Sequence, residues 1–169
     1  MIKRIALSLL FAASLAAPAL ADVKAGPLVI SDAWARATPP GARVGGGYLT
    51  VKNTGAEPDT LVSVASAASE KTQLHMMKTE DGVMTMRPAE EGVEIPAGGT
   101  LTLEPGGYHI MFIRPKAPFV QGETVPLTLT FAKAGPVDIN LAISPIGSAG
   151  PAPAADHSMH NMNHDGAAK

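Results

Sequence analysis

Turn-forming residues interrupt this sequence so often that a long helix has no room in it. The 169 residues include 17 Gly and 15 Pro, and the β-type runs between them recur at a spacing of roughly 8–12 residues. Apolar and polar residues alternate over 127–131 and 137–143, as they do in strands with one buried face. The pattern predicts an all-β sandwich or barrel. The expected strands are 28–37, 47–52, 60–65, 72–79, 83–87, 100–104, 108–114, 124–131 and 137–143.

The first 21 residues are predicted to be a secretory signal rather than part of the fold. Lys3 and Arg4 give a positive start, an apolar run follows over 5–17, and Ala19-Leu20-Ala21 is a small-x-small cleavage site. The apolar run is too short to span a bilayer. We therefore expect cleavage after Ala21 and export to the periplasm of a Gram-negative host.

Composition excludes several classes of function. The net charge of −2 leaves no basic surface of the kind that binds nucleic acid. The chain has no cysteine, which excludes disulfides, a thiolate nucleophile, and zinc, iron–sulfur or blue-copper sites built on cysteine. Apolar residues make up 46% of the chain, enough for one core. We expect a single domain over 22–147, followed by a linker and tail over 148–169.

Histidine and methionine are confined to two windows. All five His, and every Met except Met1, lie within 75–111 or 157–164. Such clustering of two metal-binding residue types indicates a shared cause rather than independent packing roles. The first window falls inside the predicted domain, and the second falls in the tail.

The first window contains a predicted hairpin. Asp81-Gly82 is a strong signal for a two-residue turn. A two-residue loop there places Met77 opposite Met86, and the strand period then puts His75 and Met84 on the same face. His75 and Met86 become diagonal neighbours at about 7–8 Å, within reach of one ion through long side chains.

A second pair of potential ligands follows. His109 and Met111 lie two residues apart in a predicted strand, so they share a face and can converge with the first pair. Thioether sulfur is soft and selects Cu(I), imidazole also suits copper, and no carboxylate belongs to the set. For Met77 and Met84 three roles stay open, namely ligand, wall of the site, or contact surface for a partner.

The tail has a different character. Residues 148–155 are only Ser, Ala, Gly and Pro, and 156–165 show no apolar period, so both are predicted to be disordered without a ligand. Interleaved His and Met indicate a flexible second metal-binding segment. Its several nitrogens and its carboxylates, Asp156 and Asp165, favour Cu(II) more than the folded site does. Its candidate ligands are His157, Met159, His160, Met162 and His164.

The folded-domain motif resembles that of the PCu(A)C family of periplasmic copper chaperones. That family carries a His, then a Met, then a His-x-Met pair. The matching positions here are His75, Met86, His109 and Met111, with spacings of 11 and 23 residues before the final pair. The likeness covers about 30–143, nearly the whole predicted domain.

The resemblance implies a fold, a ligand set and a role. The fold is a cupredoxin-like, Greek-key β-sandwich. The implied ligands are His75, Met86, His109 and Met111, holding Cu(I), and a His/Met-rich extension like this tail is linked to Cu(II). The implied role is delivery of copper toward the copper centres of cytochrome c oxidase, with an oxidase subunit or a Sco-type thiol protein as partner.

We expect a binding and transfer protein rather than an enzyme. No Ser/His/Asp set is apparent, because His75 and His109 are the only histidines of the predicted domain and both belong to the metal site. Two other interpretations stay open. One is a periplasmic copper-buffering or tolerance protein without a dedicated acceptor, and the other is an adhesion or scaffold sandwich that binds no metal.

Overall fold

The computed structural model describes residues 21–80 and 82–151, and over these residues it contains strands and no helix. None of the described segments therefore forms a helix able to cross a membrane. The strands are β1 (Val23–Ala25), β2 (Leu28–Arg36), β3 (Val44–Asn53), β4 (Asp59–Ala65), β5 (Ser69–Glu80), β6 (Val83–Pro88), β7 (Val93–Ile95), β8 (Thr100–Leu103), β9 (Tyr108–Pro115), β10 (Thr124–Phe131) and β11 (Gly135–Ser144). All nine predicted strands are present, and the all-β prediction is confirmed. The unpredicted β1 and β7 have three residues each.

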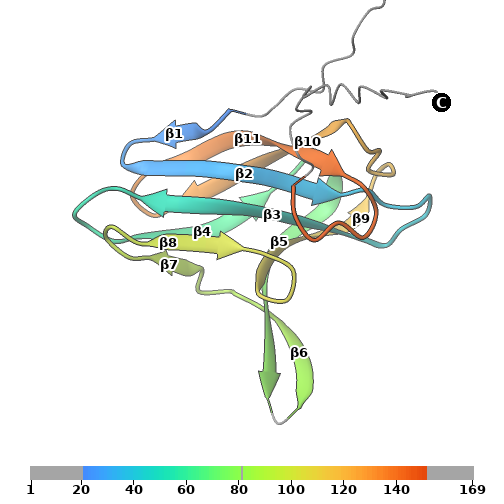
Figure 1. Ribbon diagram of the computed structural model, residues 1–169, viewed down its shortest axis with the longest axis horizontal. Helices are drawn as coiled ribbons and strands as arrows, with labels where there is room; N and C mark the ends of the chain where they lie inside the picture. Colours follow the sequence, from blue (N-terminus) through green and yellow to red (C-terminus); the bar gives the residue numbers. More distant parts are fainter. Residues whose placement is uncertain (1–20, 81, 152–169) are drawn as a thin grey trace, which may run out of the picture.

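The strands form one mixed sheet in the order β6-β5-β9-β8-β3-β2-β11-β10-β4-β7, with β1 paired to β2 and β9 also paired to β3. Most pairs are antiparallel, but β11 runs parallel to β2 and β8 parallel to β9. The sheet curls on itself, because β7 contacts β3 and β8, and β4 contacts β5. The result is two layers with the core between them (Figure 1).

Alternation along the strands decides which residues enter this core. In β10 the odd-numbered residues over 127–131 are buried, as the sequence pattern predicts. In β9, Ile110 and Phe112 have no exposed surface. Burying a side chain of this kind contributes about 1.5–3 kcal/mol. Because successive residues of a strand point to opposite faces, His109 and Met111 lie on the other face of β9.

A glycine run over 45–47 lets aromatic rings lie directly on the backbone of β3. A Cβ on Gly46 would come within 2.7 Å of the Tyr48 Oη, and on the flanking glycines it would meet phenylalanine rings at 2.9 and 2.8 Å. Any larger residue would force these rings to move. The run also pairs with β9, where Gly46 lies opposite Met111.

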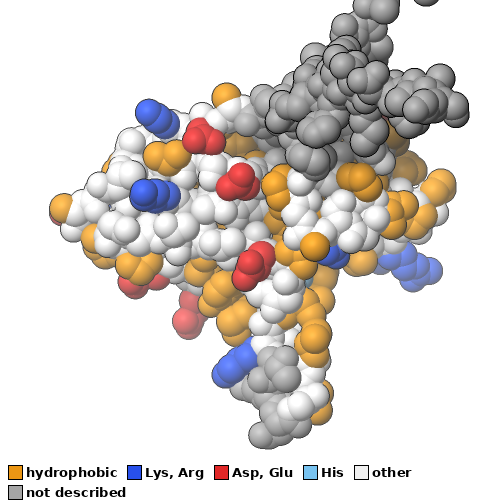
Figure 2. All heavy atoms as spheres, in the orientation of Figure 1, with side chains coloured by type: hydrophobic (Ala, Val, Ile, Leu, Met, Phe, Trp, Pro, Cys, Tyr) orange, Lys and Arg blue, Asp and Glu red, His pale blue; other side chains and the backbone are white. Residues whose placement is uncertain are grey.

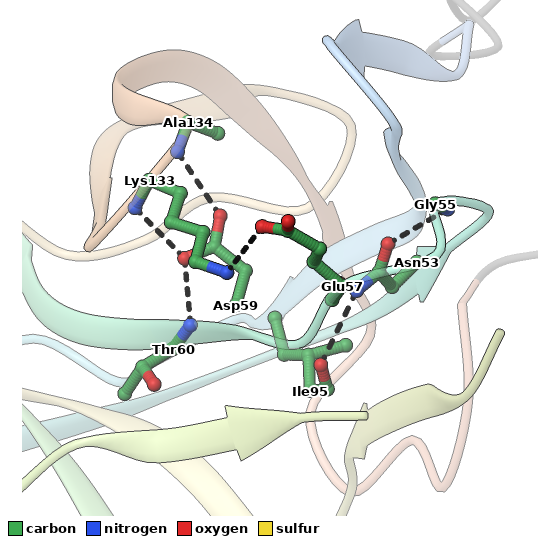
Figure 3. Close-up of polar contacts among 8 residues, drawn as sticks. All are labelled: Asn53, Gly55, Glu57, Asp59, Thr60, Ile95, Lys133 and Ala134. Atoms are coloured by element: carbon green, nitrogen blue, oxygen red, sulfur yellow. Dashed lines mark hydrogen bonds and ion pairs between the residues drawn. The ribbon is translucent and has the colours of Figure 1, made fainter. Parts of the chain in front are cut away.

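Two buried polar side chains in the body of the protein, Asn53 and Asp59, are fully paired (Figure 3). The Asn53 side chain donates to the carbonyl oxygens of Glu57 and Ile95 and accepts from the Gly55 N–H. The Asp59 carboxylate accepts three backbone N–H groups, from Thr60, Lys133 and Ala134. These bonds fix the loop after β3 to the turn between β10 and β11.

The hairpin of β5 and β6 projects from the body (Figure 1). The first part of β5, up to Met76, pairs with β9, whereas the part beyond Met76 pairs with β6 alone. Figure 2 shows hydrophobic side chains along this projection. They include Val83, Met84 and Met86, which are 62, 64 and 46% exposed. We call the segment 77–88 the arm.

Candidate metal centre

Two histidines meet where the arm joins the body. His75 of β5 lies directly opposite His109 of β9 in the antiparallel register, and their ring centroids are 5.9 Å apart. Imidazole nitrogen binds a metal ion such as Zn²⁺ at about 2.0–2.1 Å, so both rings are within reach of one ion between them. The side chains are buried, with 8 and 6% of their surface exposed.

The His109 ring is held by a backbone carbonyl. Its Nδ1 lies 3.0 Å from the Gly107 oxygen. A carbonyl oxygen only accepts, so Nδ1 carries the proton and Nε2 keeps a free lone pair. The Met77 N–H donates to the same oxygen at 3.1 Å, which ties the arm to this ring. Metal-binding histidines are oriented in this way by a partner on the second nitrogen.

The His75 ring has no such partner. Both Nδ1 and Nε2 are buried and make no hydrogen bond. A buried polar group left unpaired costs about 1–3 kcal/mol, and such groups are rare in folded proteins. Burial, with smaller contributions from the charges of His109 and Lys71, lowers the pKa of His75. The ring is therefore kept neutral, which is the form that binds a metal.

The methionines flank this pair on the same face. Met111 lies opposite Gln73 of β5 and is partly buried. At the other side, Met86 lies opposite Met77, which confirms the predicted hairpin register, and Met84 follows toward the tip of the arm. The structure thus brings the two histidines together, and it places one candidate thioether on the body and the others on the arm.

An aromatic stack borders the Met111 side of the centre. The Trp34 and Tyr48 ring centroids are 4.4 Å apart, and the Arg36 guanidinium lies 6.0 and 5.3 Å from those rings. The Tyr48 hydroxyl end covers Gly46, the cross-strand partner of Met111. Burial raises the pKa of Tyr48, and the Arg36 charge offsets this in part, so the phenol stays neutral.

Sequence reasoning missed three features of the centre. It did not predict the direct pairing of His75 with His109, the Gly107 carbonyl that orients the second ring, or the aromatic stack. A hydrogen bond from a side chain to a backbone carbonyl leaves no periodic signal, even when the two residues are close in the chain. The tail ligands His157, Met159, His160, Met162 and His164 lie outside the described residues.

Comparison with known proteins identifies the family of this chain. A family described as "Putative lipoprotein LpqE-like" matches residues 28–143. The chain belongs to the LpqE-like family. A relative named "Putative lipoprotein Lxx21020", from Leifsonia xyli subsp. xyli, is 36% identical over 137 residues, which is 81% of this chain and 75% of the relative. The predicted resemblance to PCu(A)C proteins is confirmed, because solved structures of PCuAC domains are similar to this LpqE-like chain.

Two of these structures illustrate the likeness. The "Copper-bound PCuAC domain from PmoF2" has a TM-score of 0.63 at 26% identity and covers 75% of this chain and 99% of that domain. The "Solution structure of CuI-DR1885 from Deinococcus Radiodurans" has a TM-score of 0.54 at 32% identity and covers 66 and 74%. The LpqE-like chain therefore has a PCuAC-like fold, and the fold prediction is confirmed.

Proposed function

We propose that this protein is an exported copper chaperone that binds Cu(I) through His75, Met86, His109 and Met111. The observation that carries the proposal is the unpaired His75 ring, buried opposite a His109 ring that is already oriented by a carbonyl. Elsewhere in the domain the buried Asn53 and Asp59 side chains are fully paired, so an ion is the simplest partner for these nitrogens.

The donor set supports copper over harder ions. Two imidazoles and two thioethers are neutral and soft, which suits Cu(I). Within the described ranges, no three or more His, Cys, Asp or Glu side chains gather as a possible metal site. Solved structures similar to this chain are described as copper-bound or CuI forms of their own proteins.

The two kinds of ligand have different tasks in transfer. The histidines are buried and hold the ion without a change in the fold, since their strands are paired across the body. Met86 is half exposed on the arm, so an incoming ligand atom of an acceptor protein reaches it first. A neutral thioether leaves without taking up a proton. Release to a thiolate acceptor therefore begins at Met86 and ends at the histidines.

We propose a Sco-type thiol protein or a copper-bearing subunit of cytochrome c oxidase as the acceptor, on the strength of the PCu(A)C resemblance. We place the protein in the periplasm after cleavage at Ala21. The names of the relative and of the family both contain "Putative lipoprotein", and the 169 residues contain no cysteine. The tail would act as a separate segment that binds Cu(II).

X-ray absorption of the chain shortened to Ser148 and loaded with one equivalent of Cu(I) tests the site. We expect mixed nitrogen and sulfur scattering, with the sulfur part reduced in Met111→Leu and unchanged in Met76→Leu, whose side chain lies on the other face of β5. Scattering from nitrogen and oxygen alone would overturn the ligand set. Quantitative transfer from the loaded full chain to apo acceptors then tests the role, and retention of copper against every thiol acceptor would favour a buffer.

A further inference from the structure

The arm carries three methionines on one face. Met77 lies directly opposite Met86, and Met84 lies two residues further along the same strand as Met86. All three therefore point to one side of the hairpin. Met84 and Met86 are 64 and 46% exposed, and Met77 is partly buried. Methionines usually fill cores, so a set that shares a face and has two exposed members requires another explanation.

The register brings their sulfur atoms within reach of one point. Opposed residues have Cβ atoms about 4.5–5.5 Å apart and diagonal ones about 7–8 Å, and residues two apart in a strand are separated by about 6.6 Å. A point about 4 Å from all three Cβ atoms therefore exists. A thioether sulfur lies about 3 Å from its Cβ and binds a soft ion at about 2.3 Å. Met77, Met84 and Met86 can all reach an ion at that point.

Exposure falls along the line from this cluster to the histidines. It drops from 64% at Met84 to 46% at Met86 and then to 8% at His75 and 6% at His109. Met86 adjoins both groups of side chains, because it is the cross-strand partner of Met77 and the diagonal neighbour of His75. The Met77 backbone is also bonded to the Gly107 carbonyl that orients His109.

We propose that Met77, Met84 and Met86 form an outer methionine site for Cu(I), through which the ion passes on its way to and from the histidines. Three neutral sulfur donors select a soft monovalent ion over Zn²⁺, Mg²⁺ or Ca²⁺. The ion moves inward by exchanging the Met77 and Met84 sulfurs for imidazole nitrogens while Met86 stays bound. The passage rests on the proposed function, whereas binding at the outer site does not.

Silver(I) titration of the full chain, followed by the methyl signals of 13C-labelled methionines and the ring signals of the histidines, tests the site. Ag(I) is a soft ion that mimics Cu(I) without redox chemistry. We expect early equivalents to shift the rings of His75 and His109, and a later one to shift the methyl groups of Met77 and Met84, with the Met86 sulfur shared between the two ions. The methyl signals of Met159 and Met162 report binding of silver to the tail separately.

Matched variants separate the outcomes. Leu substitutions at Met77 and Met84 conserve volume and should keep the fold, and Met76→Leu removes a thioether from the opposite face. We expect the double variant M77L/M84L to lose the later equivalent and Met76→Leu to keep it. Unshifted Met77 and Met84 methyl groups at saturation would overturn the outer site. Unshifted His75 and His109 rings would instead overturn the proposed function.

The rate of Cu(I) transfer from the loaded full chain to the chelator bicinchoninate tests the passage. We expect M77L/M84L to slow transfer at least tenfold and to leave the final distribution of copper unchanged, because the inner ligands are intact. Met76→Leu should transfer at the original rate. Equal rates in all three proteins would show that copper does not pass through the outer site.

Discussion

Replacing His75 by Leu is expected to make the metal-free protein more stable, although the change removes a proposed ligand. A neutral imidazole has one N–H and one lone pair, and neither finds a partner in the buried ring. Each unpaired group costs about 1–3 kcal/mol. Leu is similar in size and has no polar atom, but it does not match the shape of the site, so part of the gain is lost. We expect a net gain of about 1–3 kcal/mol in the free energy of unfolding, or about 4–12 °C in Tm.

Thermal and urea unfolding of the metal-free proteins measure this gain. A chelator removes residual metal, and pH 8 keeps His75 neutral, because burial lowers the pKa of that ring. The control is His109→Leu, because that ring makes a hydrogen bond to the Gly107 carbonyl and its loss should lower stability by about 0.5–1.5 kcal/mol. A destabilised His75→Leu protein, or equal effects of the two substitutions, would refute the claim that His75 is held unpaired for a ligand.

Four further results are expected. Met111→Leu should keep the fold within about 1.5 kcal/mol and weaken Cu(I) binding in a chelator competition, and unchanged affinity would remove Met111 from the site. Because the pKa of His75 is lowered in the folded state, the unfolded chain binds that proton more tightly, so metal-free stability should fall as the pH drops below about 6.5 and fall less in His75→Leu. Cu(II) binding by the full chain should fade below about pH 6.5, and deleting 149–169 should abolish it. The deletion should spare both Cu(I) binding and Tm, since the bond from Arg36 to the Ser148 carbonyl remains. Joint loss of both metals would contradict this. Peroxide should convert Met84 to the sulfoxide before Met111, and mass mapping that finds the reverse order would contradict the exposure argument.

The hairpin register was predictable because its signal is local. The turn at Asp81-Gly82 fixes the pairing of the two strands that it joins, and Met77 lies opposite Met86 as expected. The strand period likewise placed Ile110 and His109 on opposite faces. Both arguments use residues close in the chain, where turn type and alternation decide the outcome.

The junction of the two histidines was not predictable in the same way. His75 and His109 are 34 positions apart, and their strands are joined through β6, β7 and β8 rather than by a turn. Nothing in the alternation of either strand specifies which residue faces which. The pairing of β2 with β11 has the same character, since it joins the beginning of the domain to its end. Such contacts follow from the packing of the whole sheet.

The position of β11 has a consequence for when the sheet can be completed. This strand is the last of those in the described part of the chain, yet it lies between β2 and β10 in the middle of the sheet order. A polypeptide that crosses a membrane N-terminus first cannot complete the sheet until residue 144 has emerged, and a topology rich in distant pairings closes slowly. The sheet that carries the imidazole pair is therefore complete only after residue 144 has emerged. For an exported chain, as proposed above, the fold around the two rings is then finished on the far side of the membrane.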